Sequence, residues 1–227
     1  MTTQGDCFAS MEVALGCVYI PELCFYTRIL VSFYLALNDS FRAFSFGGNG
    51  MNDAEYMRLA LALAEQGRGW TAPNPMVGAV IVKDGAVIGQ GWHERYGEPH
   101  AERNALASCT ADPAGATMYV TLEPCCHHGK QPPCVDAILA SGIRRVVIGS
   151  ADPNPLVAGK GVAILRSHGV EVTKNVLRQE CDALNKIFFH YITTGRPFVS
   201  MKYAMTMDGK IAAYTGASKW VLSLIHI

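Results

Sequence analysis

Apolar and polar positions along residues 51–194 follow two different periods, which together predict the secondary structure. Apolar residues recur at helical spacing from residue 57 to residue 64, so we expect a helix that begins at Asn52 or Asp53 and ends near Gly67. Residues 77–82 and 86–92 are two apolar runs separated by Asp84-Gly85, a dipeptide typical of tight hairpin turns. The pattern therefore begins with a helix and a β-hairpin.

Further along the chain, helical and strand-like patterns alternate. Helices are predicted at residues 99–108, 133–140, 162–168 and 177–188, and strands at residues 117–122, 145–148 and 170–173. The proline-rich residues 72–75 and 151–160 are predicted to be loops. Such alternation favours an α/β sandwich whose sheet is largely parallel after the first hairpin.

The first fifty residues have a different character, and we expect residues 1–50 to lie outside the fold. Residues 13–37 are strongly apolar but are interrupted by Pro21, Glu22 and Arg28. The cleanest apolar run, residues 29–37, is about half the length that a membrane-spanning helix needs. No basic segment and no small-residue cleavage site marks a signal peptide. A membrane anchor at residues 13–37 is therefore an alternative, and a domain that starts at Met51 is the preferred interpretation.

A new strand is predicted at residues 198–205, followed by a turn at Asp208-Gly209. One strand and one turn cannot bury an apolar face. Residues 195–227 are therefore interpreted as the truncated start of a second domain. An exposed apolar strand favours association, so a homo-oligomer is a further hypothesis.

Charge and cysteine content narrow the function classes. The sequence has 19 basic and 19 acidic residues, which argues against a nucleic-acid partner bound through a basic surface. Of the 8 cysteines, three lie within residues 125–134 beside two histidines. This crowding favours metal binding over disulfides, and thiolate ligands suit a reducing compartment, so we expect a cytoplasmic protein without a membrane.

Two short segments carry the candidate chemistry. Residues 99–102 read PHAE, and residues 123–134 read EPCCHHGKQPPC. A catalytic zinc ion takes three protein ligands and keeps one position for water, and one imidazole with two thiolates meets that need. His100 and Cys125 are two candidate ligands, and Glu102 is the candidate acid and base, because deamination needs one proton moved to a ring nitrogen and then one to the departing amine. His-x-Glu and the Pro124-Cys125 pair match part of the pattern His-x-Glu and Pro-Cys-x-x-Cys that zinc deaminases carry.

The third ligand departs from that pattern. The usual second cysteine would fall at position 128, where the sequence has His128. Either His128 is the ligand or a longer loop brings Cys134 back to the site, which the turn-forming residues at 129 and 132–133 favour. A closed structural zinc site remains the alternative if the fourth position is filled by protein.

Residues 51–194 resemble the deaminase domain of the bifunctional riboflavin-biosynthesis deaminase/reductase family. The segments TAPNPMVG (71–78), GEPHAE (97–102), TLEPCCHHG (121–129), PPC (132–134) and DPNPLVAGKG (152–161) carry the resemblance. It implies the three-layer α/β/α sandwich of cytidine-deaminase-like proteins, with Cys134 as third zinc ligand. The implied reaction is hydrolytic deamination of 2,5-diamino-6-ribosylamino-4(3H)-pyrimidinone 5′-phosphate to 5-amino-6-(5-phosphoribosylamino)uracil and ammonia.

The resemblance also implies four substrate contacts, at Asn74, His93, His127 and Lys130. Their chemistry suits the roles, because a lysine offers a point charge to a phosphate and an asparagine offers both donor and acceptor to a pyrimidine edge. Three of them have an alternative: Lys130 as a solvated loop lysine, His93 as a surface residue at a strand end, and Asn74 as a turn former.

A reductase domain follows in the resembling family and uses NADPH. FVSMKYAMTMDGK (198–210) resembles its first strand and SKW (218–220) its next segment. The resemblance implies NADP contacts at Ala204 and Trp220 and a substrate contact at Ser218. Since most of that domain is absent from the sequence, we predict that the chain does not catalyse the reduction.

Two further hypotheses concern the deaminase itself. A deaminase of free bases, nucleosides or nucleic-acid strands would lack the insert at residues 127–133 and would not need Lys130. A zinc-stabilised binding module without activity would tolerate the loss of Glu102.

Overall fold

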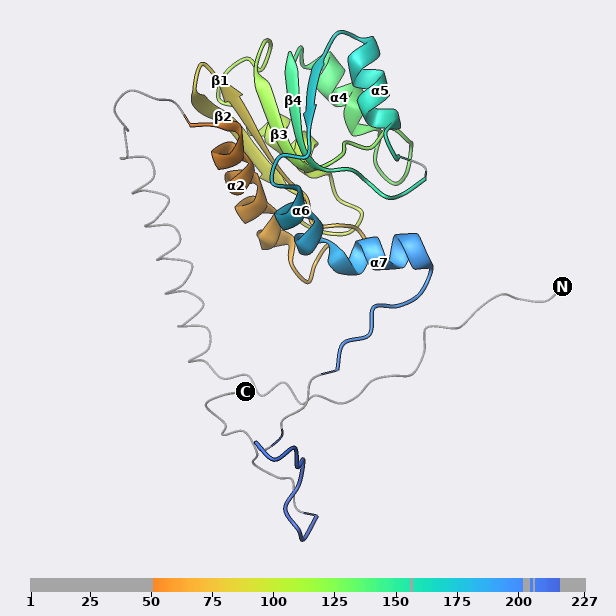
Figure 1. Cartoon of the computed structure of the whole chain (residues 1–227). Helices are drawn as coiled ribbons and strands as arrows, with labels where there is room; N and C mark the ends of the chain where they lie inside the picture. Colours follow the sequence, from red (N-terminus) through yellow and green to blue (C-terminus); the bar gives the residue numbers. More distant parts are fainter. Residues whose placement is uncertain (1–50, 156, 202–204, 206, 217–227) are drawn as a thin grey trace, which may run out of the picture. The chain divides into compact units, whose positions relative to one another are not determined.

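The computed structural model describes residues 51–216, apart from residues 156, 202–204 and 206 (Figure 1). The predictions for residues 1–50, Ala204, Ser218 and Trp220 lie outside this described part of the chain. The centre of the described part is a sheet of five strands in the order β2-β1-β3-β4-β5. The strands are β1 (Gly78–Lys83), β2 (Ala86–Trp92), β3 (Thr117–Leu122), β4 (Arg145–Ser150) and β5 (Glu171–Lys174).

The direction of the strands confirms the predicted hairpin and parallel section. Strand β1 pairs antiparallel with β2 across the turn at Asp84 and Gly85, and it also pairs antiparallel with β3. From β3 onwards the pairs β3–β4 and β4–β5 are parallel. The carboxyl ends of β3 and β4 therefore lie at the same edge of the sheet, where loops from neighbouring strands can meet.

Helices cover both faces of this sheet, as the predicted α/β/α sandwich requires. Helices α2 (Asp53–Ala64) and α6 (Arg178–Leu184) pack on one face, and α3 (Ala101–Ala107), α4 (Cys134–Ala140) and α5 (Lys160–Ser167) cover the other (Figure 1). Helix α7 (Lys186–Thr194) follows α6. A one-turn 3₁₀ helix, η1 (Glu65–Gly67), ends the first helical segment.

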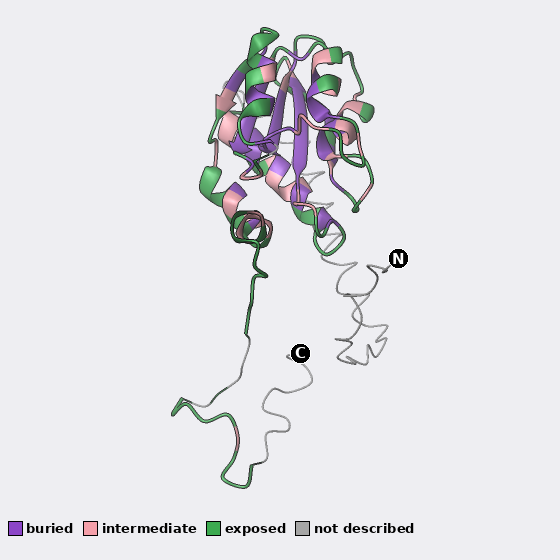
Figure 2. Cartoon of the chain, turned by 90° about the vertical axis from the view of Figure 1, so that its right-hand side faces the viewer, coloured by how far each residue is buried: buried purple, intermediate pink, exposed green. Residues whose placement is uncertain are grey.

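The apolar core lies on both sides of the central strands (Figure 2). Val80, Tyr119 and Val147 face α2 and α6, whereas Met118 and Ile148 face α3, α4 and α5. A strand buried on both faces needs apolar residues at successive positions, which explains the continuous apolar runs in the sequence. Burial of these side chains on both faces fixes the sheet between its two helical layers.

Local sequence signals place α2 over β1. Asn52 is the N-cap, and its side chain accepts from the Glu55 N–H while the Glu55 carboxylate accepts from the Asn52 N–H. This reciprocal capping box satisfies two backbone donors that the helix cannot pair. Gly78 allows the helix to approach, since a Cβ at this position would lie 2.0 Å from the Ala60 carbonyl oxygen.

Two predictions of secondary structure are wrong. The helix predicted at residues 177–188 is broken at Asn185 into α6 and α7, because the Asn185 backbone leaves helical geometry, with φ −108° and ψ 23°. The Asn185 side chain bonds there to the Met76 backbone. In the predicted strand 198–205, the described residues 198–201 and 205 form no strand. Strand geometry is stabilised by pairing, and no described residue pairs with this segment.

None of the helices in the described part of the chain has both the length and the apolar character needed to cross a bilayer. The segment 13–37, on which the membrane alternative depends, lies outside that part, so this alternative stays untested.

Candidate active site

The N-terminus of α3 brings a histidine and a carboxyl group to the carboxyl-end edge of the sheet. His100 is the N-cap of α3 and has extended backbone angles, φ −74° and ψ 164°. Glu102 is the second residue of the helix and is buried. Residues two apart within a helix would point to different sides. Because His100 precedes the helix, both side chains reach the same cavity.

The two candidate cysteine ligands are brought together by the start of α4. Cys125 lies in the loop after β3, and Cys134 is the first residue of α4. The Cys134 N–H donates to the Cys125 sulfur at 3.4 Å, and the Val135 N–H donates to the Cys125 carbonyl at 3.2 Å. The helix terminus therefore uses two of its unpaired amides to hold the Cys125 loop.

His100, Cys125 and Cys134 form a group that could hold a metal ion. Nδ1 of His100 lies 3.5 Å from the Cys125 sulfur and 3.4 Å from the Cys134 sulfur. All three donor atoms lie within 4.8 Å of one another. A tetrahedral zinc ion with ordinary bond lengths would set nitrogen and sulfur about 3.6 Å apart. The donor set and its spacing thus fit zinc, whereas His128 is exposed and is not part of the group.

Burial and mutual contacts shift the protonation of these groups. A hydrogen bond with the Cys134 side chain lowers the pKa of Cys125 to about 4, and the same bond raises the pKa of Cys134. The contact with Cys125 raises the pKa of His100. Burial raises the pKa of Glu102, which favours its protonated form relative to a carboxyl group in water. The site thus holds a readily ionised thiol and a carboxyl group poised to carry a proton.

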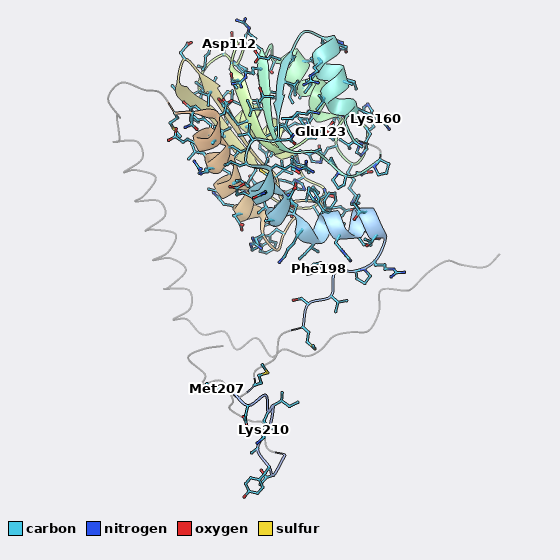
Figure 3. The ribbon with its side chains drawn as sticks, viewed as in Figure 1. Asp112, Glu123, Lys160, Phe198, Met207 and Lys210 are labelled. Carbon is cyan, nitrogen blue, oxygen red and sulfur yellow. The ribbon has the colours of Figure 1, made fainter. Side chains whose placement is uncertain are left out.

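A second buried carboxylate supports the cysteine loop from behind. Glu123 is buried and accepts from the backbone N–H groups of Gly159 and Val162 at the start of α5, at 3.1 Å and 3.3 Å. Figure 3 labels Glu123 beside this helix, near Lys160. A Cβ on Gly161 would lie 2.3 Å from the Pro124 carbonyl oxygen, so the glycine permits close packing there. Helix α5 is thereby fixed against the segment that precedes Cys125.

A cavity of about 300 Å³ opens over these groups. His100, Glu102 and Cys125 line its wall, and Cys134 lies fully buried behind them. The structure brings the four substrate contacts predicted for the deaminase domain to the same cavity, namely Asn74, His93, His127 and Lys130. Polar side chains that lie as far apart in the sequence as Asn74 and Lys130 therefore line one pocket.

His93 has its ring nitrogens engaged within the protein. Its Nε2 lies 3.2 Å from Nδ2 of Asn74, and its Nδ1 lies 3.1 Å from the Pro99 carbonyl oxygen. This pattern fits a neutral ring whose Nδ1–H donates to Pro99 and whose Nε2 accepts from Asn74. Burial lowers the pKa of His93, in agreement with a neutral ring. His93 is buried, so it is not a surface residue, and it orients Asn74 and contacts the His100 ring edge to face.

The four predicted contacts differ in which of their polar groups remain available to bind a ligand. Asn74 also forms a turn through its N–H to the Thr71 carbonyl at 2.8 Å, so the turn-forming interpretation and the pocket position hold together. Nδ1 of His127 is buried without a hydrogen-bond partner in the described part of the chain. The exposed Lys130 reaches the cavity from the same loop. His127 and Lys130 are thus the groups of this loop that are placed to meet a ligand.

Sequence reasoning assigned no role to several residues that line the cavity, including Tyr96, Asp152, Asn154 and Phe188. Asp152 is buried, and desolvation raises its pKa to about 6. The only signal for Asp152 and Asn154 in the sequence is the loop DPNP after a buried strand. For Phe188, which belongs to α7, no sequence signal pointed to the pocket.

Comparison with known proteins agrees with this geometry. Residues 51–150 match the family described as the cytidine and deoxycytidylate deaminase zinc-binding region. The riboflavin biosynthesis protein RibD of Actinobacillus pleuropneumoniae is 63% identical over 171 residues, which are 75% of this chain and 46% of that protein. RibD of Aquifex aeolicus is 54% identical over 171 residues, covering 75% of this chain and 48% of that protein.

Among solved structures, a diaminohydroxyphosphoribosylaminopyrimidine deaminase/5-amino-6-(5-phosphoribosylamino)uracil reductase from Thermotoga maritima superimposes with a TM-score of 0.72 and 52% identity. The match covers 75% of this chain and 49% of that one. The chain spans about half the length of the relatives that it matches.

Proposed function

Because the chain carries a cytidine-deaminase-like domain closely similar to that of RibD proteins, we propose that it is a zinc-dependent hydrolytic deaminase of riboflavin biosynthesis. The substrate would be 2,5-diamino-6-ribosylamino-4(3H)-pyrimidinone 5′-phosphate. Water replaces the amino group on the ring carbon, which gives 5-amino-6-(5-phosphoribosylamino)uracil and ammonia. The observation that supports this most directly is the His100–Cys125–Cys134 group with Glu102 buried beside it.

His100, Cys125 and Cys134 would hold the zinc ion, since they supply one imidazole and two thiol groups at a spacing that suits tetrahedral coordination. When bound, zinc supplies Lewis acidity and a water molecule whose pKa is lowered to about 7. The hydrogen bonds from the start of α4 hold the Cys125 loop in place, so the ligands are positioned by the fold itself.

Glu102 would carry the protons of the reaction. Deamination moves both protons of the attacking water, one to the ring nitrogen and then the other to the departing amine, and one carboxyl group can carry each in turn. The side chain contacts Cys134 and is fully buried, and burial raises its pKa. A raised pKa makes the carboxyl group a better proton acceptor during attack and keeps the proton close for the leaving amine.

The rest of the cavity fits a pyrimidine ribotide. Asn74, held by His93, would present its amide to the polar edge of the ring. Lys130 would offer a charge to the 5′-phosphate, and the unpartnered nitrogen of His127 would bond to the ribose or phosphate. These assignments separate the proposal from a deaminase of free bases, which would need no phosphate contact.

The proposal is tested by measuring bound zinc and ammonia release with the full chain, beside Glu102→Gln. We expect about one zinc ion per chain in both proteins and a kcat that falls about 10²- to 10⁴-fold in the variant. The glutamine keeps the size of the side chain but cannot shuttle a proton, so retained zinc with lost turnover assigns the proton transfer to Glu102.

Two outcomes would redirect the assignment. Zinc without turnover on the ribotide would leave the metal site but reject this substrate, and free bases and nucleosides would then be assayed. Full activity of Glu102→Gln would reject the role of the carboxyl group. The expected lack of NADPH-dependent reduction stays a prediction, which an assay of NADPH oxidation with the deaminated product tests.

A further inference from the structure

The loop after β2 and the loop that carries Lys130 meet at the mouth of the cavity through side-chain contacts that the proposed chemistry does not use. The Lys130 ammonium lies over the Tyr96 ring, 4.0 Å from its centroid. The Gln131 side-chain amide donates to the Gly97 carbonyl oxygen at 2.8 Å. Tyr96, Gly97, Lys130 and Gln131 all line the cavity. Two adjacent residues of one loop are therefore tied to two adjacent residues of the other.

From this contact we propose that Tyr96 is a positioning residue that holds the Lys130 ammonium at the cavity mouth for an anionic group of the substrate. The inference rests on the proposed function in one respect, namely that the anion is the 5′-phosphate of a ribotide. Tyr96 acts here through Lys130, and its ring is not assigned a contact with the substrate.

The physical reason lies in the freedom of a lysine side chain. An exposed lysine occupies many rotamers, and fixing it on binding costs side-chain conformational entropy. A ring face attracts the ammonium electrostatically, and the ammonium keeps N–H donors that can turn toward an anion. Lys130 is thereby held near its binding position before the ligand arrives, which lowers the cost of binding.

The backbone beneath this contact is also fixed. Gly97 has φ of 88°, in the left-handed region that favours glycine, and its carbonyl oxygen accepts from Gln131. The Tyr96 N–H donates to the Trp70 carbonyl at 3.1 Å, which anchors the loop from its other side. The Tyr96 ring therefore has a defined place from which to hold the lysine.

The chain offers a matched control in the neighbouring residue pair. The Arg95 guanidinium lies over the Trp70 ring, 4.9 Å from its centroid, and Trp70 is 61% exposed. Neither Arg95 nor Trp70 lines the cavity. Trp70→Leu therefore removes a cation–π contact next to the cavity while leaving the Lys130 contact in place.

The experiment measures two quantities in the full chain: KM for the ribotide and the dissociation constant of ribose 5-phosphate, with ribose as the uncharged probe. Tyr96→Leu is expected to raise both the KM and the dissociation constant about 3- to 5-fold, while kcat changes less than about twofold. Tyr96→Phe, which keeps the ring face, and Trp70→Leu are expected to stay within about twofold of the parent.

The second part of the experiment repeats both measurements in the Lys130→Met background. If Tyr96 acts through the ammonium, adding Tyr96→Leu to Lys130→Met raises neither quantity further. A further rise in that background would show that the ring contacts the ligand itself and would overturn the inference. A KM that is unchanged or lower in Tyr96→Leu would also overturn it, the latter because the ring would then withhold the lysine from the anion.

Binding of ribose 5-phosphate needs no turnover, so the two proposals can fail separately. A parent chain that binds ribose 5-phosphate through the Tyr96–Lys130 pair but does not deaminate the ribotide rejects the proposed function alone. A parent that deaminates the ribotide with no loss in Tyr96→Leu rejects the inference alone. Equal binding of ribose and ribose 5-phosphate by the parent would likewise overturn the inference.

Discussion

Among single residues, the choice between His128 and Cys134 decides what kind of metal site the loop can form. The turn-forming residues of the loop and then the family resemblance favoured the cysteine, and the structure places Cys134 with His100 and Cys125 while His128 is exposed. We expect Cys134→Ser to lower zinc affinity by more than about 100-fold, because even residues outside the ligand set change affinity by 10- to 100-fold. Metal analysis after dialysis against a chelator measures this.

His128→Ala is the matched control, since it removes a ring from the same loop. It is expected to keep one zinc ion per chain through the same dialysis. Loss of zinc in His128→Ala with retention in Cys134→Ser would reverse the ligand assignment.

Asp152 gives a prediction about pH because burial raises its pKa to about 6, above the ordinary 3.8. Between these two values the folded chain binds more protons than the unfolded chain, so this residue lowers stability as the pH rises through that window. Asp152→Asn removes the effect and keeps an oxygen for the Asn154 N–H. We expect its Tm to exceed that of the parent by about 2–4 °C at pH 8, once solvent screening is allowed for.

The gain of Asp152→Asn should shrink as the pH is lowered from 8 to 5, which thermal unfolding followed by circular dichroism can measure at each pH. A constant difference across that range would mean that the variant acts through packing and not through the charge of Asp152.

Among the elements, the junction of α6 and α7 is hydrogen-bonded to the loop that carries Asn74. Asn185 is buried, accepts from the Met76 N–H and donates to the Met76 carbonyl, both at 2.8 Å. Asn185→Ala would leave both backbone groups without their partner, and we expect it to lower the free energy of unfolding by about 2–4 kcal/mol. Chemical denaturation measures the change.

Asn185→Asp tests whether the amide donor matters. The carboxylate can still accept from Met76 N–H but has no N–H for the carbonyl, so a loss of stability close to that of Asn185→Ala is expected at neutral pH. A change smaller than about 0.5 kcal/mol in both variants would show that the junction does not depend on this contact.

The same junction shows why some elements could be predicted and others could not. The capping box at Asn52 and the turn at Asp84-Gly85 are local signals, and the structure has both. Buried strands such as β4 follow from runs of Val and Ile. The break at Asn185 depends on Met76, 109 residues earlier, so no local pattern could reveal it. Strand geometry at residues 198–205 was inferred from apolar content, but a strand also needs a partner.

The residues of the candidate site divide in the same way, into those that sequence patterns reveal and those that only the fold reveals. His100, Glu102 and Cys125 were found from motif spacing, because metal ligation restricts residue types and order. Residues that contribute through cavity shape or through another side chain, such as Tyr96 and Phe188, carry no such restriction and emerge only from the fold. His93 was assigned a substrate contact from the resemblance, and only the fold reveals its two hydrogen bonds within the protein.

At the scale of the whole molecule, the exposed apolar side chains after α7 lead to a prediction about self-association of the chain. Val199, Met201 and Met207 are 84%, 80% and 109% exposed. The metal group and the cavity lie within residues 74–188, so this segment contributes no described residue to them. Since exposed apolar segments favour self-association, we expect the full chain to form larger species as its concentration rises. Sedimentation velocity over a range of concentrations measures this.

Lysine at these three positions tests the cause of the association. Val199→Lys, Met201→Lys and Met207→Lys together should abolish the concentration dependence while zinc content and deaminase turnover stay within about twofold of the parent, because a charge is costly to bury at an apolar contact. Adding equal charge at exposed domain positions, with Ala140→Lys, Ala163→Lys and Gln179→Lys, should not abolish it. If both triple variants dissociate, net charge and not the apolar segment governs association; if neither does, the contact lies elsewhere on the chain.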